Sequence, residues 1–161
     1  SSIHIPLIIA GPGFNRALQI SELVSQIDLA PTLLERAGIP IPSSMQGHSI
    51  LPLLDRRITE WRNEVYIGMR EFVTGRVLRT PQWTYAVAAP KGSGWKPVER
   101  SNRYVEYMLY DLYADPFQHT NLAGRAETRE VAQMLRERLL QRIVEAGDPQ
   151  PEIEPAWFPY V

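Results

Sequence analysis

The chain has 161 residues, of which 44% are hydrophobic and 22% charged, a composition typical of an ordinary globular protein. Its 17 Lys and Arg nearly cancel its 18 Asp and Glu, so the charge indicates no nucleic-acid partner and no acidic tail. The absence of cysteine excludes a disulfide framework and a cysteine nucleophile but leaves the redox compartment open, and no apolar run reaches the roughly 18–20 residues of a membrane span.

The first segment, IHIPLIIAG at residues 3–11, is apolar at consecutive rather than alternating positions. This pattern is typical of a strand covered on both faces in the centre of an α/β sheet. Because natural chains seldom begin inside such a strand, we expect this sequence to be a piece of a longer one. Its partner strands would then be missing, and an unpaired apolar edge invites association. We therefore expect residues 3–10 to pair with a second copy of the chain or to stay mobile.

A helix is predicted from about Asp28 to Gly38. Ser25 and Asp28 fit a capping box, and Pro31 is tolerated in a first turn, where its missing amide has no partner. Glycine at position 38 suits a left-handed helix end. The residues expected to form its buried stripe are Leu29, Leu33, Leu34 and Ala37.

After a short helical turn at 49–55, short β-branched and aromatic runs separated by turns predict an antiparallel meander over residues 64–113. Residues 127–146 show the clearest helical periodicity of the chain. Its apolar positions are Val131, Met134, Leu135, Leu139, Ile143 and Ala146. The proline-rich residues 147–161 cannot continue that helix.

The three histidines, His4, His48 and His119, lie in three different segments, so no pair has the i, i+4 spacing of a helical metal site. His4, on the predicted strand, is interpreted as a buried histidine. His48 lies in a loop, where binding groups concentrate.

Asp111, Asp115 and His119 are spaced four apart, which on a helix would place them on one face. Pro116 and its neighbouring turn residues argue against a helix there. We interpret Asp115 as a carboxylate that closes a turn on nearby backbone amides, and we predict no metal site in the chain.

Arg70, Arg76 and Arg79 lie near one another in the predicted meander and together could hold an anion bidentately. The alternative is a solvated sheet face. No residue pattern in the chain forms a self-sufficient active site, so no catalytic residue is predicted.

Five segments occur in one order along the chain: HIPLIIAGPG, LVSQIDLAPTLLERAGIPIP, MQGHSILPLL, VLRTPQWTYAV and LYDLYADPFQHTNLAG. Together they resemble the C-terminal part of the sulfatase family, within the alkaline-phosphatase-like α/β superfamily, from about residue 3 to 146. The resemblance implies an α/β protein of which this fragment is α+β. Residues 1–60 would end the main α/β domain with a remnant strand and helix of its sheet. Residues 61–146 would form a small antiparallel sheet packed by a C-terminal helix, and 147–161 a tail.

The resemblance also implies a chemistry: sulfuric ester hydrolysis by a formylglycine, made from Cys or Ser in a C/S-x-P-x-R motif, together with calcium. This chain contains neither that motif nor the acidic pairs that would hold the metal. We therefore expect no cofactor in this chain, no activity from it alone, and a missing N-terminal region as its partner. His4 stands where relatives commonly have Arg.

The resemblance and the residue patterns leave five candidates for the rim of the substrate site: His4, His48, Arg70, Arg76 and Arg79. Two alternatives remain open from the sequence. The parent could be a phosphodiester or phosphonate hydrolase of the same superfamily, or the chain could be a non-catalytic binding or structural module.

Overall fold

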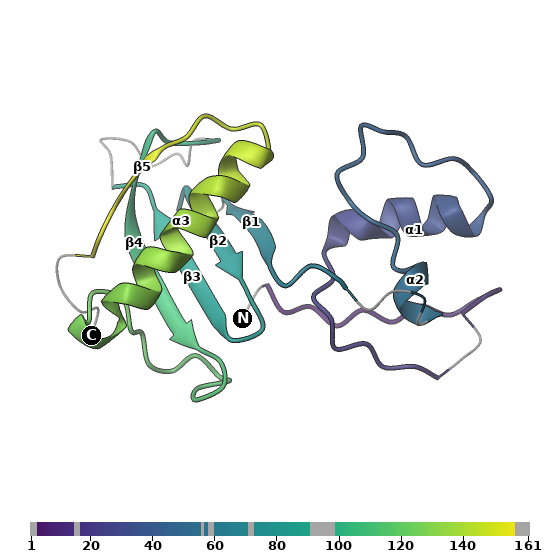
Figure 1. Cartoon of the computed structure of the whole chain (residues 1–161), viewed down its shortest axis with the longest axis horizontal. Coiled ribbons are helices and arrows are strands. Elements are labelled where there is room, and N and C mark those ends of the chain that lie inside the picture. Colours follow the sequence, from purple (N-terminus) through teal and green to yellow (C-terminus); the bar gives the residue numbers. More distant parts are fainter. Residues whose placement is uncertain are drawn as a thin grey trace. The chain divides into compact units, whose positions relative to one another are not determined.

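The computed structural model describes residues 3–14, 17–55, 57, 60–70, 73–90 and 99–156. The chain divides into two compact units, Ser1–Trp61 and Arg62–Val161. The first unit is mostly irregular chain around two helices, and the second is a sheet with one long helix (Figure 1).

The predicted first helix is confirmed. A 3-10 turn, η1 (Gln26–Asp28), leads into α1 (Leu29–Arg36), and the backbone N–H of Ser25 donates to Asp28 Oδ2 at 2.7 Å, one arm of the expected capping box. At the other end Gly38 has φ +70°, and the Ile39 amide donates to the Leu34 carbonyl at 2.9 Å. This is a Schellman ending, for which glycine is favoured because a side chain strains a left-handed backbone.

The buried stripe predicted for α1 is wrong. Leu33 is 58% exposed and Ala37 is also exposed, whereas Pro31 and Thr32 are buried. The reason is the neighbour that α1 has in the first unit: it packs with the segment around α2 (Leu51–Leu54), on the side of Thr32. Leu29 and Leu34 are half-buried, so the prediction fails at Leu33 and Ala37, which are left uncovered in this unit.

The strand predicted at residues 3–11 is not formed. Residues 4–10 have no regular secondary structure, and Ile5, Leu7 and Ile8 are exposed. A strand exists only through the backbone hydrogen bonds of a partner, and none of the described segments pairs with these residues.

The meander predicted at 64–113 is confirmed. Its strands are β1 (Val65–Met69), β2 (Gly75–Arg79), β3 (Trp83–Ala88) and β4 (Arg103–Asp111), each antiparallel to the next.

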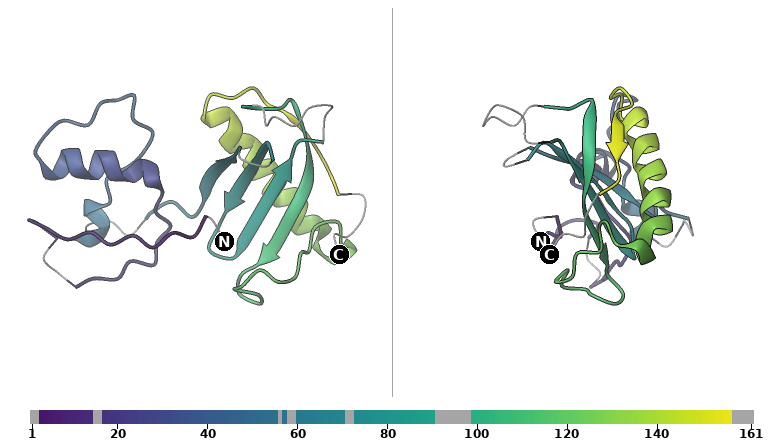
Figure 2. Two further views of the ribbon diagram at one scale, coloured as in Figure 1. Left: turned by 180° about the vertical axis from the view of Figure 1, so that it is seen from behind. Right: turned by 90° about the vertical axis from the view of Figure 1, so that its left-hand side faces the viewer.

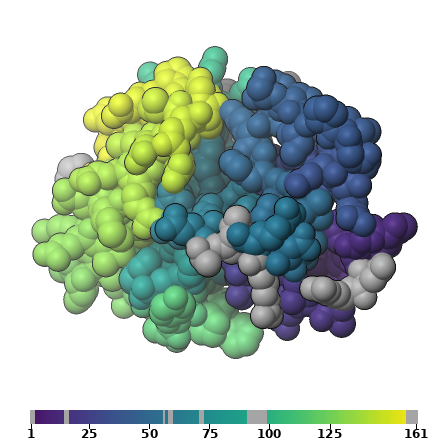
Figure 3. All heavy atoms as spheres, turned by 45° about the vertical axis from the view of Figure 1, so that its right-hand side comes forward, coloured from purple at the N-terminus to yellow at the C-terminus, as the bar shows by residue number. Residues whose placement is uncertain are grey.

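A further strand, which the sequence did not predict, comes from the proline-rich tail. β5 (Glu152–Glu154) pairs parallel to β4, so the sheet is mixed and has the order β1-β2-β3-β4-β5. In the space-filling view the yellow C-terminal segment continues the surface of the green helix that precedes it (Figure 3).

That helix, α3 (Arg129–Glu145), follows a 3-10 turn, η2 (Ala126–Thr128), and lies across one face of the sheet (Figure 2). The two layers enclose a core that includes Leu78, Tyr85, Val87, Tyr104 and Leu109 from the sheet and Ala132, Leu135, Leu139 and Ile143 from α3. The predicted stripe is correct at three of these helix positions, but Ala132 takes the place expected for Met134, which is 43% exposed.

Glu106 on β4 is a carboxylate buried between the sheet and α3, with 3% of its surface exposed. Its Oε1 accepts from the Tyr85 hydroxyl at 2.9 Å and from Arg136 Nη2 at 3.1 Å, and its Oε2 accepts from the Ala156 amide at 3.0 Å. Glu106 faces the core with Tyr104 by alternation, and a β-bulge between the pairs Val87–Glu106 and Ala86–Met108 then turns Leu109 to the same face.

A second buried carboxylate, Glu64, lies just before β1 and ties the other half of α3 to the sheet. Its Oε1 accepts from Arg142 Nε at 2.6 Å, and its Oε2 forms an ion pair with Arg138. Removing one partner from such a pair leaves an uncompensated buried charge, so these contacts fix where α3 lies.

Among the described residues, no helix is long and apolar enough to cross a membrane.

The core position of α3 predicts a large effect of Leu135→Ala. Leu135 is fully buried, so truncation leaves a cavity and should lower the free energy of unfolding by about 2–5 kcal/mol. Met134→Ala is the matched control on the exposed side, with an expected change within about 0.5 kcal/mol. Urea melts of both variants measure the difference. A loss below about 0.5 kcal/mol for Leu135→Ala would contradict this packing.

Candidate functional site

Asp28 organises the loop that carries His48. The Asp28 side chain is fully buried, and its Oδ1 accepts from the His48 amide at 2.8 Å while its Oδ2 accepts from Ser25. One turn later, Thr32 Oγ1 donates to the Asp28 carbonyl at 2.5 Å and accepts from the Ile50 amide at 3.0 Å. A carboxylate stabilised by backbone amides therefore joins the start of α1 to a loop twenty residues away in sequence.

The same loop approaches α1 so closely that residue 47 must be glycine. A Cβ at Gly47 would lie 2.0 Å from the Ile27 carbonyl oxygen and 3.1 Å from the Asp28 amide nitrogen. These are backbone atoms, which cannot rotate aside. The His48 ring itself is exposed and meets Trp61 edge-on, with ring centroids 6.4 Å apart.

His4 lies in the irregular segment 4–10 and is exposed. The interpretation of His4 as a buried histidine is therefore wrong, because the strand that would have buried it is not formed.

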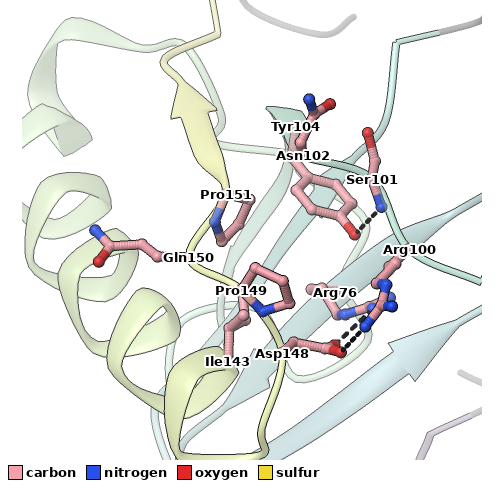
Figure 4. Close-up of a pocket in the computed structure, with 10 residues that line it drawn as sticks. All are labelled: Arg76, Arg100, Ser101, Asn102, Tyr104, Ile143, Asp148, Pro149, Gln150 and Pro151. Carbon is pink, nitrogen blue, oxygen red and sulfur yellow. Dashed lines mark hydrogen bonds and ion pairs between the residues drawn. The ribbon is translucent and has the colours of Figure 1, made fainter.

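Arg76 on β2 lies in a pocket of about 150 Å³ (Figure 4). Its guanidinium is buried, donates from Nη2 to Asp148 Oδ2 at 3.0 Å and from Nη1 to the Gly75 carbonyl at 3.0 Å, and lies 5.8 Å from the centroid of the Tyr104 ring. Arg100 approaches the other oxygen of Asp148 at 3.5 Å. The positive charge of Arg76 is thus balanced by the Asp148 carboxylate of the same unit.

The end of α3 brings Asp148 to Arg76. Gly147 has φ +88°, its amide donates to the Val144 carbonyl at 2.9 Å, and the Asp148 amide donates to the Ile143 carbonyl at 3.1 Å. This Schellman ending reverses the chain within two residues of the helix. The carboxylate that follows it then lies over the sheet face that α3 covers.

The three arginines do not form one anion clamp. Arg70 pairs with Glu99 at 2.6 Å on the exposed surface. Arg76 and Arg79 are three residues apart on one strand, and because side chains alternate faces along a strand they point to opposite sides of the sheet. Arg79 Nη1 donates to Thr84 Oγ1 at 2.8 Å.

Asp111, which ends β4, and Asp115 close a turn on backbone amides, as predicted for Asp115. Asp115 Oδ2 accepts from the Thr120 amide at 2.7 Å, and Asp111 Oδ1 accepts from the Tyr113 amide at 3.0 Å. The hydrogen bond from the Thr120 amide, with that from the His119 amide, lowers the pKa of the Asp115 carboxyl below its usual 3.8.

The described residues do not fit the calcium that the sulfatase resemblance implies for a longer protein. Calcium requires about six to eight oxygen ligands, and within the described ranges no group of three or more His, Asp or Glu side chains is arranged to hold a metal. The buried carboxylates already have partners: Asp28 accepts backbone amides, while Glu64 and Glu106 pair with arginines.

Sequence reasoning missed Asp148 and the two buried glutamates. In the sequence Glu64 and Glu106 look like solvated charges, one just before β1 and one within β4, and the position of α3 buries them. Asp148 carried one usable signal, since it directly follows the glycine that ends a helix.

Comparisons of the sequence and of the fold with known proteins agree on one family. The family described as "N-sulphoglucosamine sulphohydrolase, C-terminal" matches residues 1–145. The protein named Arylsulfatase K from Bos taurus is 34% identical over 135 residues, which is 78% of this chain and 23% of that protein. A putative sulfatase from Bacteroides thetaiotaomicron has a similar fold, with a TM-score of 0.60 and 28% identity over 75% of this chain and 25% of its own.

Another solved structure, in complex with its substrate D-glucosamine-2-N,6-O-disulfate, has a TM-score of 0.62 and 26% identity, covering 77% of this chain and 24% of its own. The fold and the order of segments thus define a sulfatase C-terminal domain. The chain belongs to the N-sulphoglucosamine sulphohydrolase C-terminal family, which confirms the resemblance found in the sequence. It spans about a quarter of the length of these relatives.

The buried Asp28 carboxylate predicts a local effect of Asp28→Asn. An amide oxygen can accept only one of the two hydrogen bonds, and leaving a buried N–H unpaired costs about 1–3 kcal/mol. Hydrogen exchange at one of the two amides, Ser25 or His48, should therefore accelerate by about tenfold or more, while the other keeps its acceptor.

Glu35→Gln, an exposed carboxylate on the same helix, is the control and should leave both amides unchanged. Equal exchange rates in Asp28→Asn and the unsubstituted chain would show that this carboxylate does not hold the loop.

The Asp115 turn predicts a defined response to acid. Because the folded pKa lies below 3.8, the stabilising contribution of Asp115 is present above that pH and is lost as pH falls through the folded pKa. An NMR titration of the carboxyl carbon should show a midpoint below 3.8. Asp115→Asn should remove this part of the acid response, and a midpoint at or above 3.8 would refute the turn contacts.

Proposed function

We propose that this chain is the C-terminal portion of a sulfatase-like hydrolase that cleaves sulfuric esters. The observation that carries the proposal is the family match over residues 1–145, supported by relatives named as sulfatases that are about four times as long. A further solved structure of similar fold is in complex with its substrate D-glucosamine-2-N,6-O-disulfate. A sulfated amino sugar is therefore the substrate class to test first.

Within that proposal, this chain alone is catalytically incomplete. Formylglycine would supply the nucleophile and calcium the positive charge that stabilises the developing negative charge. The sequence has no cysteine and no C/S-x-P-x-R motif from which a formylglycine could be made. Both groups would come from an N-terminal region of a longer protein, which we infer to be the partner of this chain.

The first unit has the surface expected of the end of a larger α/β domain. Leu33, Ile5 and Ile8 are exposed, and an open depression of about 400 Å³ lies beside α1, lined mostly by apolar residues. Exposed apolar patches of this kind mark interaction sites. We propose that residues 1–60 complete the main domain and that residues 61–146, with β5, form the subdomain.

In the absence of that larger domain, residues 3–10 would expose the same apolar side chains. Self-association of the isolated chain through this segment stays a prediction, supported by the exposure of Ile5, Leu7 and Ile8.

The rim candidates differ in their exposure and in how firmly their backbone is held. Arg76 and Arg70 are already engaged with Asp148 and Glu99. His48 has an exposed ring on a rigidly held backbone, and His4 is exposed on an irregular segment. We propose His48 as the better placed of the two histidines for a rim contact. No observation favours a phosphodiester or phosphonate hydrolase, or a non-catalytic module.

The proposal is tested by comparing this chain with the longer protein that contains it. The longer protein should hydrolyse glucosamine 2-N-sulfate or 6-O-sulfate, or a chromogenic aryl sulfate, and the 161-residue chain should release no sulfate from any of them. Aryl phosphate and a phosphodiester serve as controls for the superfamily alternatives. Turnover by the repurified chain, abolished by a substitution within it, would refute its catalytic incompleteness. Turnover of phosphodiesters alone by the longer protein would refute the sulfatase assignment.

A further inference from the structure

Among the described residues, Arg79 has no acidic partner, whereas the other two arginines of the strands, Arg76 and Arg103, each have one. Arg79 ends β2, on the face turned away from α3, because Leu78 beside it points into the core under α3. Within the described part of the chain, the only polar contact of its guanidinium is the hydrogen bond from Nη1 to Thr84 Oγ1 at 2.8 Å. No carboxylate of the described residues lies within ion-pair distance.

Partial burial of Arg79 makes the lack of a counter-charge among the described residues energetically unfavourable. The side chain is only partly exposed, and burial lowers the pKa of its guanidinium. Arg76 on the same strand, by contrast, is buried with Asp148 beside it. A cation taken out of water is stabilised only when an acceptor takes the place of its hydration.

The sheet places two further donors in line with Arg79. Arg79 is directly opposite Thr84 on β3, and Thr84 is directly opposite Tyr110 on β4, so the three side chains share one face. Thr84 Oγ1 accepts from Arg79, which leaves its own O–H free to donate. Among the described residues the Tyr110 hydroxyl has no hydrogen-bond partner, and burial raises its pKa, so it remains a neutral donor.

We propose that Arg79, flanked by Thr84 and Tyr110, is a binding site for an oxyanion that lies outside the described residues. A guanidinium presents a planar fork of N–H groups that matches a carboxylate or a sulfate with two parallel hydrogen bonds. The hydroxyls of Thr84 and Tyr110 add donors along the same row.

The oxyanion has two possible sources with this shared chemistry. It is either a carboxylate side chain of the longer protein or the sulfate group of a substrate. The second source rests on the proposed function, and the first does not.

The first experiment asks whether the chain binds an oxyanion at all. Sodium sulfate and sodium acetate are titrated into the 161-residue chain at constant ionic strength set with sodium chloride, and the Nε–H signals of the arginines are followed by NMR. We expect a saturable shift of the Arg79 signal. Arg79→Gln should weaken binding about tenfold or more, because it removes a charge-assisted hydrogen bond.

Two variants make this result specific. Arg70→Gln removes an exposed arginine that already has Glu99 as its partner, and it should leave the titration unchanged. Arg79→Lys keeps the charge but not the fork, and it should retain part of the affinity; it also serves if Arg79→Gln does not fold. No saturable response to either anion, or an equal response in Arg79→Gln, would overturn the proposal.

The second experiment distinguishes the two sources in the longer protein. If the oxyanion is a protein carboxylate, Arg79→Gln should lower the melting temperature and leave KM for an aryl sulfate unchanged. If it is the substrate sulfate, KM should rise about tenfold or more at an unchanged melting temperature. An unchanged melting temperature and KM would overturn the proposal. A longer protein without sulfatase activity would refute the proposed function, while the titration and the melting temperature would still decide the role of Arg79.

Discussion

The second unit depends on the need of one buried carboxylate, Glu106, for partners. A carboxylate removed from water between a sheet and a helix is tolerated only when its oxygens accept hydrogen bonds, several of them from charged or strongly polar donors. The donors come from three other places in the chain: β3 through Tyr85, α3 through Arg136 and the segment after β5 through Ala156. Hydrophobic contacts hold α3 against the sheet, but the hydrophobic effect has no preferred direction. The directional bonds to Glu106 specify its position.

The same rule operates in the first unit, where backbone amides donate to the buried carboxylate. Asp28 is as deeply buried as Glu106, and its charge is stabilised by backbone amides from two segments, with Gly47 allowing the close approach. Each unit thus supplies hydrogen-bond donors to a buried carboxylate from segments distant in sequence. In a unit with little regular structure and few buried apolar residues, a carboxylate that accepts amide hydrogen bonds holds segments together.

Local features of the sequence predicted local structure well. The capping residues around Asp28, the glycine at position 38 and the β-branched and aromatic runs of β1 to β4 are local signals, and the structure has the elements they indicate. The failures all involve partners distant in sequence. The stripe of α1, the strand at 3–11 and β5 depend on what lies against them, and periodicity does not contain that information. The suggestion that Arg70, Arg76 and Arg79 hold one anion failed for a related reason. Residues close along a strand can point to opposite faces of the sheet.

The contribution of the residues after α3 bears on where this domain ends. The family match stops at residue 145. Beyond it, the Asp148 carboxylate pairs with Arg76, and β5 pairs with β4. The Ala156 amide donates a hydrogen bond to Glu106. A boundary drawn from family similarity alone would therefore cut through the polar framework rather than after it. A recombinant fragment ending there would keep every apolar residue of α3 and still leave two buried charges without part of their compensation. In such a protein, solubility and yield would depend on about ten residues that look dispensable in the sequence.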